Sequence, residues 1–281
     1  MPKTTRPAFS DSDIDRLNVP MKIGLLATVN GEGLPHLTLI STLQPCQPRQ
    51  MAWGQFTEGL CKRFVRENPK TGFLIMTLDK QLWRGKATFT HVAQQGKEYE
   101  MYNNVPMFRY NAYFGVHTVY YMGLVEQYGQ EALPMNSIVL DAIKTMLAKA
   151  LARKSRAEVL NLWTQQLLNQ ATNLKFLAYV GADGYPVIIP VIQAQALDSA
   201  RVVFSTSVYA DELAAIPDRA TVAVFGMSLD MEDVLMRGEW RVERIGGVRC
   251  GVVNVNWVYN PMPPKPQQIY PELPLEPVTV F

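Results

Sequence analysis

The stretch from Ile23 to Thr42, IGLLATVNGEGLPHLTLIST, most constrains what this chain can fold into. Two apolar runs, residues 23–29 and 34–43, flank the segment Asn30-Gly31-Glu32-Gly33. Asn and Gly tolerate the positive φ angles that hairpin turns require. The second run alternates apolar and polar side chains with a period of two, which is typical of a strand. The stretch therefore predicts a β-hairpin that opens a barrel.

The same pattern returns at residues 177–191, LAYVGADGYPVIIPV. Four residues recur at one offset of 151: Ala27, Val29, Gly33 and Pro35 match Ala178, Val180, Gly184 and Pro186. Further along, Arg84-Gly85 recurs as Arg237-Gly238 in the same order. Because an internal repeat determines the architecture of a chain, we predict two copies of one β-domain.

Composition limits the function classes. A chain of 281 residues has room for two domains, and 48% hydrophobic residues argue against disorder. The net charge of +2 favours neither nucleic acid nor a membrane surface as partner. Three well-separated cysteines fit a reducing compartment. Since the sequence has neither a signal peptide pattern nor a long apolar run, we expect a soluble, cytoplasmic protein.

We expect a mainly β protein with helices (α+β), built of two Greek-key split β-barrels in tandem. Its five predicted segments are an N-terminal arm (1–20), a first barrel (21–130), a helical connector (131–172), a second barrel (173–260) and a proline-rich tail (261–281). An aromatic-rich loop from Met107 leads into a strand over 118–127.

Two helices are predicted in the connector. Residues 138–153 place apolar side chains such as Ile143 and Leu147 at helical spacing, and Ser155-Arg-Ala-Glu158 resembles a capping box that starts a second helix ending near Gln170. An amphipathic helix with a basic end can bind a membrane, but capped helices with ordinary apolar stripes more often pack in a core or a dimer. We favour packing.

Several familiar sites are missing from the sequence. Gly31-Glu32-Gly33 lacks the third glycine of a dinucleotide fingerprint, and no Walker-type phosphate loop or serine nucleophile elbow occurs. The three histidines, His36, His91 and His117, are scattered without the spacing of metal ligands. We therefore predict no metal site, and the sequence identifies no catalytic residue.

The junction at residues 57–63 remains as a candidate. A helix N-terminus presents free N–H groups that suit a phosphate, and Lys62 and Arg63 fall within its first two turns. The alternative is a solvated basic face that binds nothing.

The order of these elements resembles the pyridoxamine 5'-phosphate oxidase-like FMN-binding split barrels. The matching residues are 36–42 on the second strand, 53–57 ending the third, Lys62-Arg63 and Asn68-Pro69 on the helix, and Gln81 with Gly85-Lys86-Ala87 on the next strand. The resemblance covers residues 21–127 and, more weakly, 173–256.

The resemblance implies a barrel that pairs so that FMN lies between two barrels. The basic pair on the helix and hydroxyls near the third strand would hold the flavin phosphate, residues 38–42 would line the ring system, and Gln81 would contact the flavin. The implied cofactor-binding set is His36, Thr38, Ser41, Thr42, Gln55, Thr57, Lys62, Arg63, Gln81 and Arg84.

The chain departs from the oxidase itself. Its second strand begins with His36, and it ends PELPLEPVTVF instead of carrying the Arg-Leu-x-Pro motif of that enzyme. We therefore expect an FMN-dependent oxidoreductase of unknown substrate that forms a homodimer and uses a small-molecule substrate or electron donor. The alternative is a non-catalytic split-barrel protein that carries haem or another cofactor, with one histidine as axial ligand.

The two copies differ at the helix. Lys62-Arg63 corresponds to Ala210-Asp211, followed by Glu212. Carboxylates at this position would repel a phosphate, so we predict that the second copy has lost the phosphate site and that each chain binds one FMN.

Overall fold

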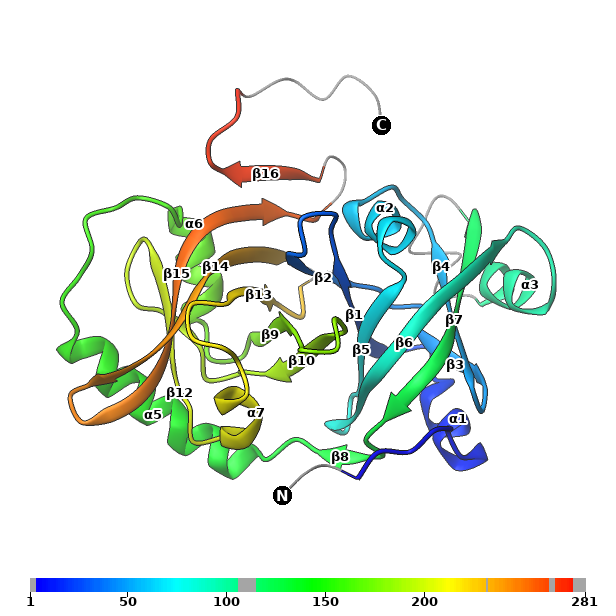
Figure 1. Cartoon of the computed structure of the whole chain (residues 1–281), viewed down its shortest axis with the longest axis horizontal. Coiled ribbons are helices and arrows are strands. Elements are labelled where there is room, and N and C mark those ends of the chain that lie inside the picture. The colour runs from blue at the N-terminus through cyan, green and yellow to red at the C-terminus, as the bar shows by residue number, and fades with distance from the viewer. Residues whose placement is uncertain (1–3, 106–114, 231, 263–265, 275–281) are drawn as a thin grey trace. The chain divides into compact units, whose positions relative to one another are not determined.

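The computed structural model describes residues 4–105, 115–230, 232–262 and 266–274 (Figure 1). Over these residues the chain is mainly β, with six helices and two eight-stranded antiparallel sheets. The predicted fold class is therefore confirmed. The chain divides into two units, one of residues 1–133 and 180–188, and the other of residues 134–179 and 189–281. The five predicted segment boundaries remain a prediction.

Unit 1 contains the first sheet, in the order β2-β1-β5-β6-β7-β4-β3, with β8 paired to β6. Its strands are β1 (Lys22–Val29), β2 (Pro35–Leu39), β3 (Gln44–Gln47), β4 (Gln50–Gln55), β5 (Lys70–Thr77), β6 (Gln81–Ala93), β7 (Thr118–Gln127) and β8 (Glu131–Ala132). Its helices are α1 (Asp11–Leu17), α2 (Leu60–Glu67) and α3 (Lys97–Asn104).

The opening hairpin forms as expected. Gly33 at the turn has a φ of 78°, which favours glycine. The Asn30 side-chain oxygen accepts the backbone N–H of Leu34 at 2.8 Å, so the turn is held by its own asparagine. Ala27 of β1 then pairs with Leu37 of β2 and, on the other side, with Gly72 of β5.

Contacts of a few side chains determine where α1 begins and how α2 is oriented. Ser10 caps α1 in a capping box with Asp13, and the indole Nε1 of Trp83 donates to Asp13 at 2.8 Å. On α2 the apolar face of Cys61, Phe64 and Val65 is buried, and the helix ends before Asn68-Pro69. This buried face fixes which residues of α2 point outward.

Residues 180–188 belong to unit 1 and contact its strand β6 at three places. Asp183 accepts the Nζ of Lys86 at 2.7 Å, and the hydroxyl oxygens of Tyr185 and Thr88 lie 2.8 Å apart. The guanidinium of Arg84 donates to the backbone oxygen of Ile188 at 3.0 Å. Unit 1 is therefore completed by a segment that follows it far along the chain.

The second sheet has the corresponding order, β10-β9-β13-β14-β15-β12-β11, with β16 paired to β15. Its strands are β9 (Leu174–Val180), β10 (Pro186–Pro190), β11 (Gln195–Ala196), β12 (Arg201–Ser205), β13 (Thr221–Met227), β14 (Asp233–Ile245), β15 (Val248–Asn260) and β16 (Gln267–Tyr270). The helices that follow residue 133 are α5 (Met135–Leu151), α6 (Leu162–Asn169) and α7 (Ala210–Ala214).

The repeated sequence features occupy corresponding places. Gly184 has a φ of 80°, close to that of Gly33. At Gly85 a Cβ would lie 2.1 Å from the Glu126 carbonyl oxygen, and at Gly238 it would lie 2.2 Å from that of Asn254. Each of these strands also has a register shift beside its glycine. Both sheets thus use the Arg-Gly pair where two strands approach closely.

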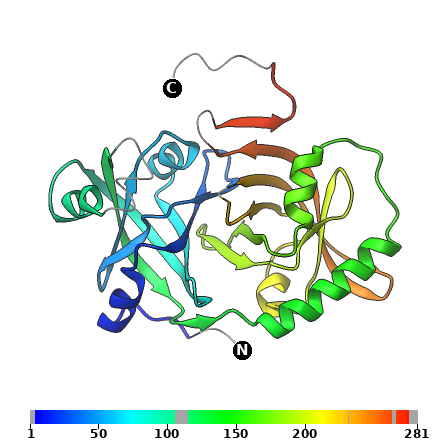
Figure 2. The ribbon, with the colours of Figure 1, turned by 180° about the vertical axis from the view of Figure 1, so that it is seen from behind.

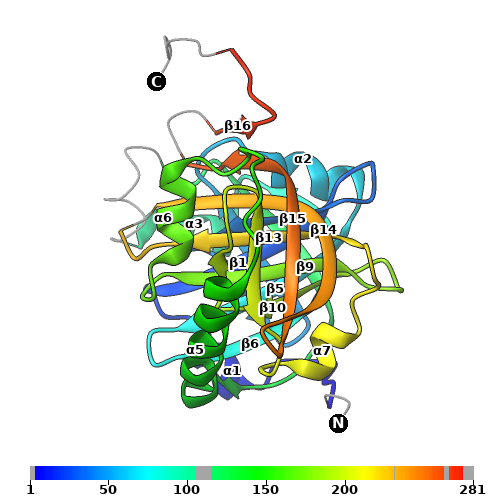
Figure 3. The same cartoon turned by 90° about the vertical axis from the view of Figure 1, so that its left-hand side faces the viewer.

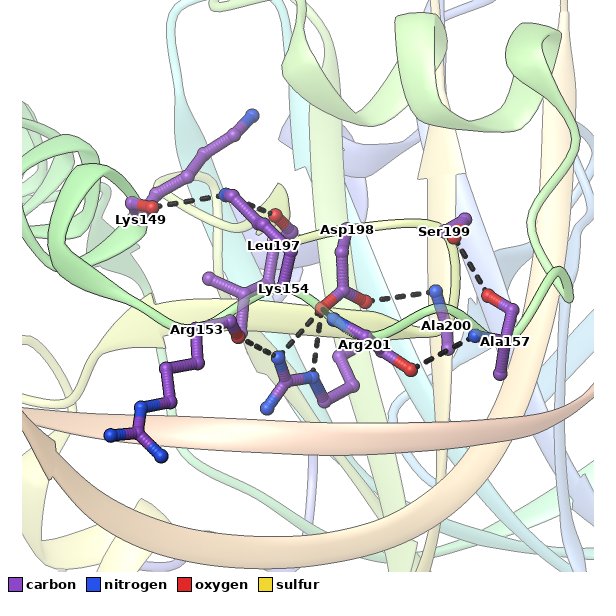
Figure 4. Close-up of polar contacts among 10 residues, drawn as sticks. Lys149, Arg153, Lys154, Ala157, Leu197, Asp198, Ser199, Ala200 and Arg201 are labelled. Atoms are coloured by element: carbon purple, nitrogen blue, oxygen red, sulfur yellow. Dashed lines mark hydrogen bonds and ion pairs between the residues drawn. The ribbon is translucent and has the colours of Figure 1, made fainter.

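The predicted capping box at Ser155 is wrong, because α6 begins at Leu162 and is capped by Asn161. Figure 4 shows why residues 153–157 stay extended: they are held by hydrogen bonds to residues 197–201. Asp198 accepts the Ser155 backbone N–H at 2.8 Å and also binds Arg201. Burial alone would raise the pKa of Asp198, but these bonds lower it below its usual range.

Other differences are local. Strands β3 and β16 and helix α3 were not predicted from the sequence. The predicted loop over residues 107–117 lies largely outside the described residues, while β7 spans Thr118–Gln127 as predicted. None of the described helices combines the length and apolar character that crossing a membrane requires.

Candidate functional site

A cavity of about 510 Å³ opens in unit 1 beside α2, at the ends of β4, β6 and β7. It is lined by Gln55, Glu58, Gly59, Lys62, Arg63, Arg66, Glu67, Val92, Gln94, His117, Thr118 and Tyr120. Its volume falls within the range of roughly 300–1,000 Å³ that is usual for small-molecule sites.

Helix α2 gives this cavity its positive charge. Lys62, Arg63 and Arg66 all line it, because the opposite face of the helix is buried. Gly59 occupies the N-cap position, no side chain caps the helix there, and its first turn carries no acidic residue. Lys62 folds back toward this end, its Nζ 3.3 Å from where a Cβ on Gly59 would lie. Helix dipole and lysine charge thus act on the same space.

A chain of hydrogen bonds holds the wall of the cavity. Arg66 donates to the Tyr120 hydroxyl at 3.3 Å, Tyr120 donates to Gln55 at 3.0 Å, and Gln55 donates to Glu58 at 2.7 Å. The Tyr120 ring stacks on Trp53 with centroids 4.0 Å apart. Burial raises the pKa of Tyr120 even though Arg66 acts to lower it, so the phenol stays protonated and can donate.

Two carboxylates of the cavity lining, Glu58 and Glu67, oppose this positive charge. Glu67 lies 3.4 Å from Arg63 and accepts the Gly31 backbone N–H at 3.2 Å. The Arg63 and Glu67 side chains are 64% and 39% exposed, and such i,i+4 pairs are worth only about 0.3–0.5 kcal/mol. A charge-assisted hydrogen bond to an anion is worth roughly 1.5–3 kcal/mol. An incoming phosphate can therefore take Arg63 from Glu67.

Three of the sequence-predicted site residues, Gln55, Lys62 and Arg63, come together in this cavity. Thr57 is exposed and lies outside α2; it lines a neighbouring hollow of about 560 Å³ that shares Gln55, Glu58 and His117 with the cavity.

The predicted residues on and after β2 lie elsewhere in unit 1. His36 is buried, with its ring edge-on to Phe64 at 5.2 Å. The Thr42 hydroxyl is buried and accepts the Gly54 backbone N–H at 2.9 Å. Thr38 and Ser41 are half-buried. None of these four side chains lines the described wall of the cavity.

Gln81 and Arg84 lie toward the far end of β6 from the cavity, which the strand reaches at Val92. About 25 Å of extended strand separates Arg84 from Val92 at roughly 3.3 Å per residue. Arg84 is buried and pairs with Glu131 at 2.8 Å, and Gln81 accepts a hydrogen bond from Gln130 at 3.0 Å.

Arg66, Tyr120, Gln94 and Thr118 were not predicted from the sequence as cavity residues, and His117 was considered only as a possible haem ligand. Arg66 carried a signal, because it follows Lys62 by four residues and so lies on the same helix face. Tyr120 reaches the cavity through the pairing of β4 with β7, where it lies opposite Trp53. That pairing has no local signature in the sequence.

The corresponding part of unit 2 is different. Helix α7 begins after Tyr209, a residue in left-handed conformation, and its first turn carries Asp211 and Glu212. The cavity beside it measures about 180 Å³, and Arg249 is the cation in its described lining.

No protein-family model and no curated protein matches this sequence. Among solved structures, an FMN-binding protein from Syntrophomonas wolfei covers 43% of this chain and 83% of its own, with a TM-score of 0.35 and 15% identity. HupZ from Group A Streptococcus covers 44% and 98%, with a TM-score of 0.36 and 13% identity. An F420 reductase covers 42% and 98%, with a TM-score of 0.34 and 15% identity. At these scores the likenesses identify no ligand or reaction for this chain.

Proposed function

We propose that this chain is an FMN-binding flavoprotein whose flavin phosphate is held in the cavity beside α2. The observation that carries the proposal is the convergence of Lys62, Arg63 and Arg66 with the uncapped start of that helix on one cavity. A phosphate dianion needs cations and N–H donors together, and the cavity offers both.

The remaining lining residues suit the rest of the ligand. Val92, which is 40% exposed, offers apolar surface to a planar ring system, while the exposed Gln94 and His117 offer polar groups at the rim. The Tyr120 hydroxyl is fixed by Arg66 and Gln55, so the wall is already ordered before a ligand binds.

As an enzyme, the chain would be an oxidoreductase acting on a small-molecule substrate or electron donor. When bound, FMN supplies the ability to accept or pass a hydride. The residues of the chain bind its phosphate and orient its ring.

The same strand order in both sheets supports a further part of the proposal, that the units arose by duplication of one split barrel. Three free cysteines support a reducing, cytoplasmic location.

The test is an FMN titration followed by flavin fluorescence, with Lys62→Ala and Arg66→Ala beside the unaltered chain. Each substitution removes a charge-assisted contact worth roughly 1.5–3 kcal/mol, so FMN affinity should fall tenfold or more. Arg49→Ala serves as matched control, because Arg49 is exposed and lies in the turn between β3 and β4.

Riboflavin, which lacks the phosphate, separates the phosphate site from the ring site. Its affinity should be the same in the unaltered chain and in the Lys62→Ala chain. Unchanged FMN affinity in both the Lys62 and the Arg66 variants would show that the phosphate does not bind in this cavity.

A haem carrier is the second candidate, and one observation favours it. His117 is exposed at the cavity rim, its Nδ1 2.8 Å from the Thr118 hydroxyl, which leaves Nε2 as an axial ligand. His36 is buried and His91 stacks on Tyr121 at 4.6 Å. The absorbance spectrum of the purified chain distinguishes the two: flavin bands support FMN, whereas a haem band lost in His117→Ala supports the alternative.

A further inference from the structure

Helix α5 (Met135–Leu151) of unit 2 has a buried face and, opposite to it, an exposed apolar face. The buried face, with Ile138, Asp141, Thr145 and Ala148, packs against β12, β14 and β15. Figures 2 and 3 show α5 beside the second sheet. The other face is exposed, and we call it the α5 stripe: Val139, Leu140, Ile143, Met146, Leu147 and Leu151.

The exposure of the α5 stripe is large and continuous. Its six side chains are between 52% and 66% exposed. Together they present on the order of 600 Å² of apolar surface, which is the upper end of what single-chain proteins leave open. The buried face of α5 is mixed, with Asp141 and Thr145 beside Ile138 and Ala148, so the larger apolar face of the helix is the exposed one. Exposed apolar patches of this size mark interaction surfaces.

We propose that a second copy of this chain covers the α5 stripe, so that two α5 helices pack together across a two-fold axis. A symmetric pairing would bury on the order of 1,200 Å² in total from the stripes alone, which reaches the range of stable interfaces. Residues bordering the stripe would add to that area. This interface lies outside the proposed flavin cavity and does not depend on it.

The spacing of the side chains fits helix-to-helix packing. Leu140, Ile143, Leu147 and Ala150 follow one another at intervals of three, four and three residues, which is the spacing of a coiled-coil seam. Ala150 is small enough to let two helices approach closely. The three larger side chains of the seam, Leu140, Ile143 and Leu147, come before it along the helix. A flat sheet or a flexible peptide would not require this seam.

The charges near α5 argue against a membrane surface as the partner. Membrane-binding helices carry free lysines and arginines beside the apolar face. Here Lys144 binds Asp141 and Ser207 at 2.9 and 3.0 Å, and Lys149 binds Asn169 at 2.7 Å. Lys154 donates to two backbone oxygens, those of Lys149 and Leu197. These three lysines are committed within the unit, the exposed Arg153 comes after the end of α5, and the stripe itself is uncharged.

The test is sedimentation velocity of the full chain over a concentration series from nanomolar to tens of micromolar. The unaltered chain should dimerise. Leu147→Glu places two charges in the symmetric interface and should raise the dimer dissociation constant by about 100-fold or more. Leu78→Glu is the matched control, because Leu78 is a 64% exposed leucine on the turn between β5 and β6; it should leave the dimer unchanged.

Each outcome decides the proposal. Circular dichroism verifies that Leu147→Glu remains folded, and Leu140→Ser provides a milder variant that should also weaken the dimer. An unaltered chain that stays monomeric at all concentrations would overturn the proposal, as would a dimer that survives both stripe substitutions. Co-sedimentation of the monomer with vesicles of phosphatidylcholine and phosphatidylserine (3:1) would overturn it in favour of a lipid surface.

Discussion

Asp233 at the start of β14 brings a carboxylate into the interior of unit 2. Its side chain is 8% exposed, and its Oδ1 has no hydrogen-bond partner among the described residues. Burial raises the pKa of this carboxyl to about 7. The unfolded chain titrates near the ordinary value of 3.8, so between about pH 4 and pH 7 the folded state binds more protons. Stability attributable to Asp233 therefore falls as the pH rises through that window.

We expect Asp233→Asn to stabilise the protein at pH 8, because it removes a charge that burial disfavours. The gain is at most about 4 kcal/mol, and it should shrink toward zero as the pH falls to 4. Urea unfolding of both chains at pH 4.5, 6 and 8 measures the difference. Asp230→Asn, at an exposed neighbour, is the control and should not follow this profile. A gain that is equal at all three pH values would contradict the assignment.

Single residues also show where sequence reasoning succeeds. Lys62 and Arg63 were predictable at the cavity because an apolar helix face and a terminating Asn68-Pro69 fix the orientation of the helix. The position of Arg84 was not predictable, because the sequence does not show which end of β6 lies beside α2. Its guanidinium is held by Glu131 instead. Tyr120 required knowledge of which strands pair.

At the scale of elements, the close approach of β6 and β7 depends on Gly85. A Cβ there would meet the Glu126 carbonyl oxygen at 2.1 Å and the Phe73 ring at 2.9 Å. Backbone atoms cannot move aside as a flexible side chain can, so the two strands would have to separate where the pairing already shifts.

We therefore expect Gly85→Ala to lower the free energy of unfolding by roughly 1–3 kcal/mol, the usual effect of overpacking. Gly123→Ala on β7 is the matched control. The nearest atom to its Cβ would be Thr90 Cγ2 at 3.8 Å, which is an ordinary contact. Thermal and urea unfolding of the two variants provide the comparison. Equal stability of the two would mean that β6 and β7 are not this close.

The elements that the sequence predicted well are those with strong local signals. The turn residues 30–33 between two apolar runs predicted β1 and β2. A capping box, at Ser10, also starts α1. The similar signal at Ser155 failed because Asp198 competes for the Ser155 backbone N–H, and a contact across 43 residues cannot be read locally. The tertiary hydrogen bonds of Asp198 thus outweighed the local helix propensity of residues 155–158.

At the scale of the whole molecule, the two units differ at the position of the proposed phosphate site. In unit 1, α2 presents three cations to a cavity of about 510 Å³. In unit 2, α7 is only five residues long and has Asp211 and Glu212 in its first turn. These carboxylates would repel a phosphate placed at that end.

The expected stoichiometry is therefore one FMN per chain. Equilibrium dialysis or flavin absorbance of the protein freed of unbound FMN measures it against the protein concentration. In the Lys62→Ala, Arg66→Ala double variant that value should approach zero at FMN concentrations that saturate the unaltered chain. Two equivalent sites per chain would disprove the difference between the units.

The division of the chain has a consequence for its synthesis. Unit 1 needs residues 180–188 as well as residues 1–133, and the nascent chain grows by about 5–20 residues per second. Roughly 2–10 s therefore pass on the ribosome between residue 133 and the segment that supplies Asp183 to Lys86 and the Ile188 carbonyl to Arg84. The strands of the first sheet all precede residue 133 and can pair before that segment exists, but these contacts of unit 1 form only afterwards. The last contacts of unit 1 are therefore timed by the appearance of the first hairpin of the second sheet.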